Sequence, residues 1–384
     1  MFPARHDPRN AYKACERTES ERLGFASFRG LELHYVRNEP QMKTFLCASP
    51  SDGHRWQEFV DACAGSTNYH RWNWKQVIEK SFGWPTYYWM AEEDHKIHGV
   101  LPLVWQKSRL FGSFITSLPF LNAGGIIAEN KAAEQALLGE AISIAKQVGA
   151  KHVELRHREQ HQLNLPTKTS KVTLVLPVRP DADKMWKDLG TKMRTKVRKS
   201  MSFGMTAEFG GHQLLDEFYP VFCGNMRDLG TPVYSKSFFS EILRAFPQDT
   251  FICAVRHGDK TVAASFLSGY RDRIEAVWSS SAKEFLHLKP NLFLYWSLLC
   301  FAGQKGYHLF DFGRSSAGSG THEFKLQWGA ETVPLHWDYW LSDGDQMPEL
   351  NPQNPKYRMA IWMWQRLPLS LTRGLGPRIV RYLP

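Results

Sequence analysis

The residue types best suited to chemistry in this 384-residue chain lie in one segment, GYHLFDFGRSSAGSGTHEFKLQWG, which spans Gly306–Gly329. Its short apolar run, Leu309–Phe312, is typical of a buried strand that carries Asp311 and is closed by Gly313. Burial makes the ionised form of a carboxyl costly, so Asp311 is the first candidate for a general base. A structural role is the alternative, in which Asp311 accepts backbone N–H bonds at the turn.

A glycine-rich turn follows this strand and predicts a binding site for an anionic cofactor. Small residues let the main chain approach a diphosphate closely, and a helix after the turn would add its positive end. The candidate cofactor-binding residues supply a guanidinium, hydroxyls and open backbone, and they are Arg314, Ser315, Gly318, Ser319 and Gly320. Because a glycine pattern alone is a weak signal, an ordinary mobile loop is the competing interpretation.

Glu275 is the second candidate base, because it precedes a hydroxyl cluster on the predicted strand RDRIEAVWSSS. Its alternative is a surface glutamate of that strand. Two other chemistries have little support. The motif HREQH, from His157 to His161, lacks the glutamate position of a zinc protease, so solvated loop histidines are predicted rather than metal ligands. No Gly-x-Ser-x-Gly elbow is present, which argues against a serine hydrolase.

Composition predicts a folded protein with an anionic partner. Hydrophobic residues make up 43% and aromatic residues 13% of the chain, whose length favours two domains over one. The net charge of +10 fits a nucleotide, tRNA, a diphospholipid or a membrane surface, and does not choose among them. Six cysteines without paired spacing indicate neither a disulfide framework nor a zinc site, and no secretory signal is visible. A cytoplasmic protein is therefore expected, with the inner face of the inner membrane as a further option.

An internal repeat sets the predicted architecture. Two strands joined by a charged turn are expected at Tyr87–Val104 and again at Thr250–Tyr270. A helix, a glycine stop and a strand ending near an arginine are expected at Ala145–His157 and again at Phe301–Ser315. Both comparisons are offset by about 160 residues, which indicates a duplicated α/β unit.

The predicted fold class is therefore α/β (α+β), with two tandem units whose mixed, largely antiparallel sheets are flanked by helices. The expected divisions are a polar N-terminal extension at 1–30, a first unit at 31–180, a basic connecting helix at 181–205, a second unit at 206–345 and a basic aromatic tail at 346–384.

Two basic segments are candidates for binding anions. The connecting helix, Asp183–Ser202, has apolar residues along one side, and Lys192, Arg194 and Arg198 are predicted to contact substrate phosphate or RNA. A solvated basic face is the alternative. The tail Tyr357–Pro384 mixes tryptophans, leucines and arginines, which favours packing against its own domain, with contact to an anionic bilayer as the alternative.

Several segments together resemble the Fem-type (FemAB) transferases, from about Gly30 to the C-terminus. They are TKMRTKVRKSMSFGM (191–205), KGYHLFDFGRS (305–315), HEFKLQWGAE (322–331), LPFLNAGG (118–125), VELRH (153–157), NMRDLGTPVY (225–234) and PRIVRYLP (377–384). The last four look like the branch associated with exosortase and PEP-CTERM systems in Gram-negative bacteria, which is connected with exopolysaccharide production.

The resemblance implies two copies of the GNAT acyltransferase fold and transfer of an acyl or aminoacyl group to an amine or hydroxyl of a cell-envelope or exopolysaccharide precursor. The donor co-substrate would be acyl-CoA, as in ordinary GNAT enzymes, or aminoacyl-tRNA, as in characterised Fem-type enzymes, with no permanently bound cofactor or metal. The chain lacks the long heptad-patterned arm of some Fem proteins, which leaves tRNA use open. A non-catalytic binding component of a polysaccharide assembly system is a further alternative.

The resemblance also assigns roles to residues. Lys325 matches the Fem-type lysine of the FK segment, where an ammonium would stabilise an oxyanion or bind the acceptor, and an exposed helix lysine is the alternative. The segment around Arg227 is loop-like and suited to selecting acceptors, although an internal Arg–Asp pair would explain it equally. The remaining predicted substrate-binding residues are Asp228, Tyr234, Ser279, Asn291 and Tyr295.

Overall fold

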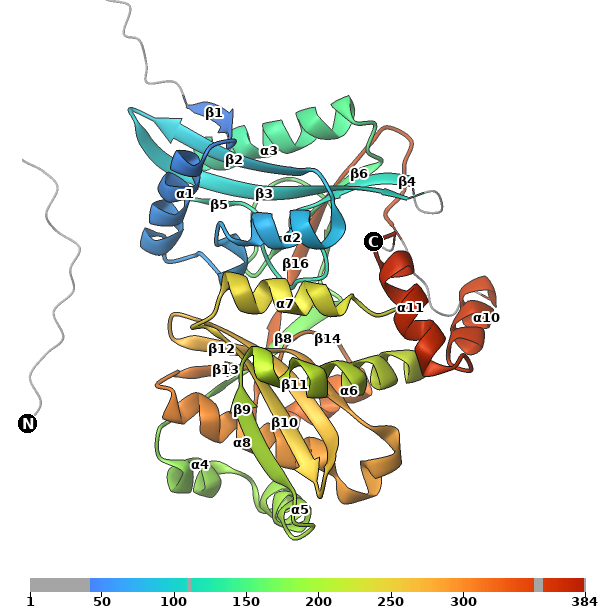
Figure 1. The fold of residues 1–384 in the computed structure, drawn as a ribbon. Coiled ribbons are helices and arrows are strands. Elements are labelled where there is room, and N and C mark those ends of the chain that lie inside the picture. The colour runs from blue at the N-terminus through green and yellow to red at the C-terminus, as the bar shows by residue number, and fades with distance from the viewer. Residues whose placement is uncertain (1–41, 109–111, 349–354, 383–384) are drawn as a thin grey trace, which may run out of the picture. The chain divides into compact units, whose positions relative to one another are not determined.

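The computed structural model describes residues 42–108, 112–348 and 355–382, so the predicted extension at 1–30 lies outside the described residues. All of them belong to one compact unit, Pro40–Pro384. Figure 1 shows two sheets, one above the other, with helices on their faces. The prediction of two mixed, mostly antiparallel sheets flanked by helices is confirmed.

The first sheet has the strand order β1-β2-β3-β4-β6-β16-β7, with β5 paired to β3. Its only parallel neighbours among the described strands are β4 and β6. The strands are β1 (Lys43–Leu46), β2 (Thr86–Glu93), β3 (Lys96–Ser108), β4 (Gly112–Thr116), β5 (Ile127–Ala128), β6 (His152–His157), β7 (Thr167–Lys168) and β16 (His336–Leu341). Its helices are α1 (Pro50–Ala62), η1 (Asn68–His70), α2 (Trp74–Phe82) and α3 (Lys131–Gln147).

The second sheet has the order β14-β8-β13-β12-β11-β10-β9, with β15 paired to β8 and with β12 and β13 parallel. Its strands are β8 (Lys171–Pro177), β9 (Thr206–Gly210), β10 (Thr250–His257), β11 (Lys260–Tyr270), β12 (Arg273–Ser281), β13 (Leu309–Asp311), β14 (Ser315–Ser316) and β15 (Glu331–Pro334). Its helices are α4 (Ala182–Asp188), α5 (Thr191–Met201), η2 (His212–Leu214), α6 (Leu215–Asp228), α7 (Lys236–Ala245), η3 (Lys283–Leu288), α8 (Pro290–Gln304) and α9 (Gly320–Leu326). The chain ends in α10 (Pro355–Trp364) and α11 (Leu369–Val380).

The structure confirms the predicted repeat. The hairpin β2–β3 corresponds to β10–β11, and each has a two-residue turn and a bulge just before it. Helix α3 followed by β6 corresponds to α8 followed by β13. β6 runs parallel to β4, and β13 runs parallel to β12. The repeated elements therefore build two sheets of the same plan.

The two sheets exchange strands. β8 precedes most of the second unit in the chain but pairs antiparallel with β13 in the second sheet. β16 comes after the second unit and pairs antiparallel with β6 in the first sheet. No single cut in the sequence therefore separates the sheets, although the predicted divisions place β8 in the first unit and β16 in the second.

The basic segment predicted as one connecting helix forms two short helices, α4 and α5, with extended backbone at Leu189 and Gly190 as the N-cap of α5. Met193 and Val197 are buried in the core of the second unit. The segment is thus part of that unit, because its apolar side has a sheet and α8 to pack against.

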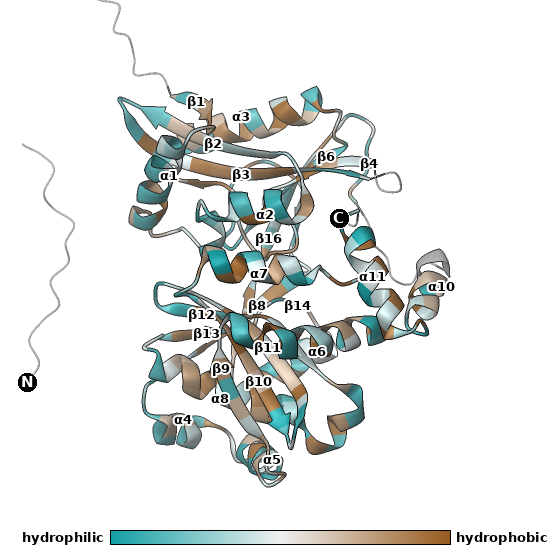
Figure 2. Cartoon of the chain, in the orientation of Figure 1, coloured by the Kyte–Doolittle hydropathy of each residue, from teal (hydrophilic) through white to brown (hydrophobic). Residues whose placement is uncertain are grey.

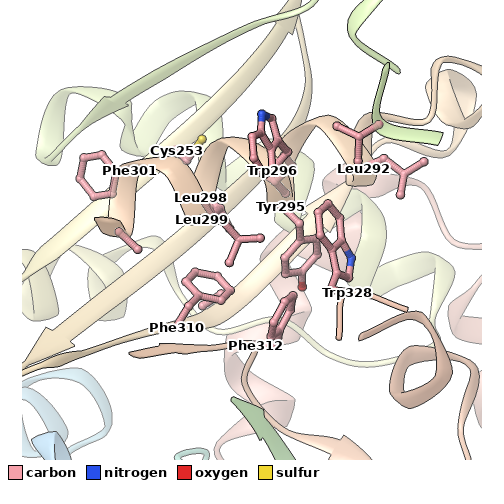
Figure 3. Close-up of a cluster of buried hydrophobic side chains, with 14 of the residues drawn as sticks. Cys253, Leu292, Tyr295, Trp296, Leu298, Leu299, Phe301, Phe310, Phe312 and Trp328 are labelled. Atoms are coloured by element: carbon pink, nitrogen blue, oxygen red, sulfur yellow. The ribbon is translucent and has the colours of Figure 1, made fainter. Parts of the chain in front are cut away.

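Two apolar clusters position the elements that carry the site. One lies between α8 and the second sheet, where Tyr295, Phe312 and Trp328 meet (Figure 3). The other joins the two units, because Phe82 of α2 packs against Phe238 of α7. Buried apolar surface of this kind fixes the distance between the sheets.

A buried polar pair anchors the exchanged strand β16. His157, at the end of β6, binds Asp338 of β16 through Nδ1 at 2.7 Å, and its Nε2 accepts the backbone N–H of Ile126 at 3.0 Å. Nδ1 therefore carries the proton, and burial lowers the pKa of His157. The prediction of a solvated loop histidine at His157 is wrong, since VELRH is entirely buried strand. His161 does lie beyond the strand and stacks on His157 at 4.0 Å.

The Asp338→Ala variant should lose about 3 kcal/mol of unfolding free energy, because the buried His157 Nδ1–H and the Thr167 hydroxyl both lose their acceptor. Urea denaturation measures the loss. Asp343→Ala, at an exposed position just past β16, is the matched control and should be near neutral. Equal stability of the two variants would contradict a structural role for the pair.

Candidate active site

Two carboxyl groups lie opposite each other where β12 and β13 begin to diverge. The parallel pairing of these strands ends with Glu275 opposite Asp311, after which β12 continues to Ser281 while β13 stops. The chain turns away at Gly313, where φ is +73° and a Cβ would lie 2.6 Å from the carbonyl oxygen of Ala276. Only glycine fits there, which explains the Asp-Phe-Gly order in the sequence.

Glu275 is buried and surrounded by neutral donors. Its side chain accepts the Tyr69 hydroxyl at Oε2, at 2.8 Å, and the Asn122 amide at Oε1. The residue is only 5% exposed. Burial, followed by the charge of Asp311, raises the pKa of Glu275 to about 7. Glu275 can therefore exchange a proton near neutral pH, and its interpretation as a surface strand glutamate is wrong.

Asp311 is held by the fold through charged and neutral donors. Its Oδ1 accepts the Thr173 hydroxyl and the Gly313 backbone N–H, the latter at 2.9 Å. Its Oδ2 lies 3.4 Å from a terminal nitrogen of Arg273 and 3.8 Å from one of Arg158. Asp311 thus accepts a backbone N–H bond at the turn, as the alternative to a catalytic base predicted, and its charge lies beside Glu275.

Lys325 reaches this cluster from α9. Its Nζ donates to the carbonyl oxygen of Gly313 at 2.7 Å and to that of Arg314 at 3.1 Å. Lys325 is only 6% exposed, and this burial lowers its pKa to about 8. Two of the three ammonium donors are thus used by backbone carbonyls. The alternative of an exposed helix lysine is wrong.

A cavity of about 370 Å³ opens between the two sheets, with Glu275 in its wall. Four arginines line it, together with the loop around Tyr69 from the first unit: Arg156, Arg158, Arg271 and Arg273. Arg271 is occupied by backbone carbonyls at the end of α1, and Arg156 by Glu154 and the Leu121 carbonyl. The buried Nε of Arg158 has no hydrogen-bond partner among the described residues. Arg158 and Arg273 both lie beside the Asp311 carboxylate and stay partly exposed, so they add positive charge to this wall of the cavity.

The equivalent place in the first unit has no comparable carboxyl pair. There the last parallel pair sets Thr116 opposite Glu154. Burial opposes the ionisation of Glu154, but Arg156 at 2.6 Å and the Tyr339 hydroxyl at 2.6 Å hold its pKa below the usual range. Glu154 is thus ionised and paired with Arg156, and the carboxyl with a pKa near neutrality, Glu275, belongs to the second unit.

The predicted cofactor-binding turn divides into two parts. Arg314 lies with its guanidinium 5.2 Å from the Trp337 ring, and Ser315 is buried with a hydroxyl that lacks a partner among the described residues. Gly318 donates its N–H to His322, and Ser319 caps α9 through its hydroxyl. Much of the turn's binding capacity is thus used by the protein itself.

The other predicted binding residues lie at three places: the end of α6, an aromatic cluster, and α8 with its neighbouring strand. Arg227 and Asp228 pair with each other at 2.8 Å at the end of α6, so the internal pair is confirmed, on a helix rather than a loop. Tyr234 packs among aromatic rings that include Trp278. The other three residues lie on or beside α8: Ser279 binds Ser265 at 2.8 Å, Tyr295 lies beside Ser279, and Asn291 is in the first turn of α8.

The basic residues of α5 do not reach the carboxyl cluster. Lys192 and Arg198 are exposed, and Arg194 donates to the Lys187 carbonyl at 3.1 Å. Figure 1 shows α5 at the lower end of the second unit, away from the junction between the sheets.

Sequence reasoning missed the residues that surround the carboxyls. They are Tyr69, Asn122, Arg158, Thr173 and Arg273. Asn122 and the strand before Arg158 stood in recognisable motifs, LPFLNAGG and VELRH, but no local pattern shows that they approach Glu275.

Comparison with known proteins identifies the fold. Residues 191–326 match a family described as "Acetyltransferase (GNAT) domain". A crystal structure of FemX superposes with a TM-score of 0.59 at 15% identity, over 77% of this chain and 97% of that chain. A tandem GNAT protein from the clavulanic acid biosynthesis pathway superposes with a TM-score of 0.51 at 9% identity, over 80% of this chain and 100% of its own. The chain has a tandem GNAT fold.

A third similar structure is the C-terminal domain of a putative lysylphosphatidylglycerol synthetase from Agrobacterium fabrum, with a TM-score of 0.50 at 12% identity over 75% of this chain and 91% of that chain. No curated protein matches the chain significantly. At these identities the structures establish the fold alone. The two tandem GNAT units expected from the Fem-type resemblance are confirmed, whereas the exosortase and PEP-CTERM branch stays a prediction.

The Glu275→Gln variant should gain stability relative to the wild type as pH rises from about 5 to 8. The folded pKa of Glu275, about 7, lies above the unfolded value of 4.5, so its stabilising protonated form is fully present below pH 4.5 and is lost as pH rises through 7. Glutamine has no such proton to lose. Thermal unfolding of both proteins across this range measures the difference, and a difference that does not change with pH would contradict the raised pKa.

Proposed function

We propose that this protein is an acyltransferase that joins an acyl or aminoacyl group to an amine or hydroxyl of a cell-envelope or exopolysaccharide precursor. The observation that carries the proposal is Glu275, a buried carboxyl with a pKa near neutrality, in a cavity wall at the point where the parallel strands of the second GNAT unit diverge. A proton acceptor in that position is what amide or ester formation requires.

The proposed reaction uses two groups of this cluster. Glu275 takes a proton from the acceptor's amine or hydroxyl as its nitrogen or oxygen bonds to the donor's acyl carbon. The bond from that carbon to the donor's sulfur or oxygen then breaks, and the leaving atom takes up the proton that Glu275 accepted. The remaining donor of the Lys325 ammonium stabilises the negative charge that develops on the acyl oxygen. Asp311 acts through Glu275, because its charge helps to keep that carboxyl's pKa high.

The acceptor is assigned to the cavity between the sheets. Both units contribute to its wall, and Arg158 and Arg273 favour an acceptor that carries a phosphate or carboxylate. An envelope or polysaccharide precursor is the class that the Fem-type resemblance implies. The likeness in fold to FemX and to a putative lysylphosphatidylglycerol synthetase supports this class.

The donor is assigned to the start of α8, with acyl-CoA as the leading candidate. A groove of about 240 Å³ there is lined by Lys196, Lys289 and Asn291, and α8 begins without a side-chain cap. Pro290 has no N–H and that of Leu292 is bonded to the Lys289 carbonyl, so the N–H of Asn291 and two ammonium groups are the donors proposed for a diphosphate. In the first unit the matching helix, α3, is capped by Asn130, which leaves less room for an anion. The turn at Arg314 stays a prediction for further cofactor contacts.

Precursors from cells with and without this protein should differ by the mass of one acyl or aminoacyl group. Reintroduced Lys325→Ala or Glu275→Gln should fail to restore the heavier species, because oxyanion stabilisation or proton removal is lost. Mass spectrometry of lipid-linked and polysaccharide precursors is the measurement. Glu323→Ala, an exposed change on the same helix, is the control and should restore it. Restoration by both site variants, folded and at normal levels, would instead favour a non-catalytic role.

Replacing Lys196 and Lys289 together with glutamine should raise the KM for acyl-CoA about tenfold and change kcat little, because binding of a diphosphate weakens before chemistry begins. Steady-state kinetics with purified protein is the measurement, and Lys187→Gln, an exposed lysine of α4, is the control. Turnover of aminoacyl-tRNA and none of acyl-CoA would overturn this donor. Donor binding would then be assigned to the exposed face of α5, where Lys192 and Arg198 would give salt-dependent binding of RNA.

A further inference from the structure

The C-terminal helix pair, α10 and α11, is attached to the protein along one side only. Thr372, Gly376 and Val380 are buried at successive turns of α11, which packs on α6. A Cβ at Gly376 would lie 2.7 Å from Val233, so this contact is close. The end of the pair is tied to the first unit, because Arg381 donates to the Phe82 carbonyl at 2.8 Å.

The apolar face of α11 is wider than this contact covers. Leu371, Leu375 and Ile379 recur every four residues and fall within an arc of about 80°. They lie next to the buried arc, yet each is 37% to 50% exposed. The protein thus leaves about half of the apolar side of α11 in contact with water.

Helix α10 adds a second exposed apolar group, made of Met359, Trp362 and Met363, which are 54% to 63% exposed. The described chain exposes twelve large hydrophobic side chains; six of them lie in this helix pair, and a seventh, Tyr382, lies just beyond α11. Figure 2 shows hydrophobic and hydrophilic residues interspersed along both helices. Such a concentration of exposed apolar side chains indicates a surface that binds a membrane or another molecule.

The charge around this surface selects the occupant. Residues 355–384 contain six lysines and arginines and no aspartate or glutamate. Arg378 is exposed beside the apolar arc of α11, and Arg366 lies 3.8 Å above the Trp362 ring. Apolar side chains with aromatic rings and surrounding arginines are the composition of helices that lie in the interface of an anionic bilayer. A second copy of the same basic surface would be repelled by it.

We propose that the C-terminal helix pair docks the protein on an anionic lipid surface, with its exposed apolar side chains among the acyl chains and its arginines at the headgroups. None of the described helices is long and apolar enough to cross a bilayer, so the contact is peripheral. The proposal is independent of the transfer reaction, since none of its residues belongs to the carboxyl cluster.

Sedimentation of the full chain with vesicles tests the proposal. Binding should be strong with phosphatidylglycerol mixed into phosphatidylcholine and at least tenfold weaker with phosphatidylcholine alone. Leu375→Glu and Arg378→Glu should each weaken binding to the anionic vesicles about tenfold or more. Leu46→Glu, which adds the same charge at a 43% exposed position on β1, should bind like the wild type. Thermal unfolding of each variant checks that these exposed changes leave the fold intact.

Other results would overturn the proposal. Equal recovery with both kinds of vesicle, or equal binding by Leu375→Glu and Leu46→Glu, would show that the helix pair does not bind anionic lipid. Analytical ultracentrifugation distinguishes the other occupant: a dimer that Leu375→Glu converts to a monomer, with no vesicle binding, would assign the surface to a second copy of the chain.

Discussion

The site depends on one electrostatic constraint, which is the burial of two carboxyl groups side by side at the end of the parallel strand pair in the second sheet. Ionising both in a place removed from water is costly. The two carboxyls have different hydrogen-bond donors. Two guanidiniums face Asp311, whereas Glu275 accepts hydrogen bonds from a phenol and an amide. The resulting rise of the Glu275 pKa from 4.5 to about 7 corresponds to about 3 kcal/mol. That cost creates a proton acceptor that works near neutral pH.

The exchange of strands between the sheets holds this constraint in place. β8 supplies Thr173 to Asp311, and the loop that carries Arg158 follows β6, so the carboxyl cluster is built from both halves of the chain. The duplicated position in the first unit shows the other outcome, because Glu154 is neutralised by Arg156. The two units of one fold thus differ: the second carries the carboxyl with the raised pKa, and residues of both units line the cavity.

Much of the fold could be predicted from the sequence, because hydrophobic periodicity and the repeat report local structure directly. Asp311, Glu275 and Lys325 were found by strand position and by resemblance, and the structure brings them together. The exchange of β8 and β16 between the sheets could not be predicted, because the residues of β16 do not indicate which sheet that strand joins. The donors to Glu275 were also missed, because Tyr69 lies 206 residues away in the chain and only the folded contact relates them.

The central claim is that Glu275 titrates near neutral pH in the folded protein. Isotope-edited infrared spectroscopy of protein labelled at the glutamate side-chain carboxyl measures this directly, with the Glu275→Gln variant subtracted to assign the band. A protonated-carboxyl band that disappears with a midpoint near pH 7, and is missing from the variant, is the predicted result. A midpoint near 4.5, with Glu275 fully ionised at neutral pH, would contradict the account.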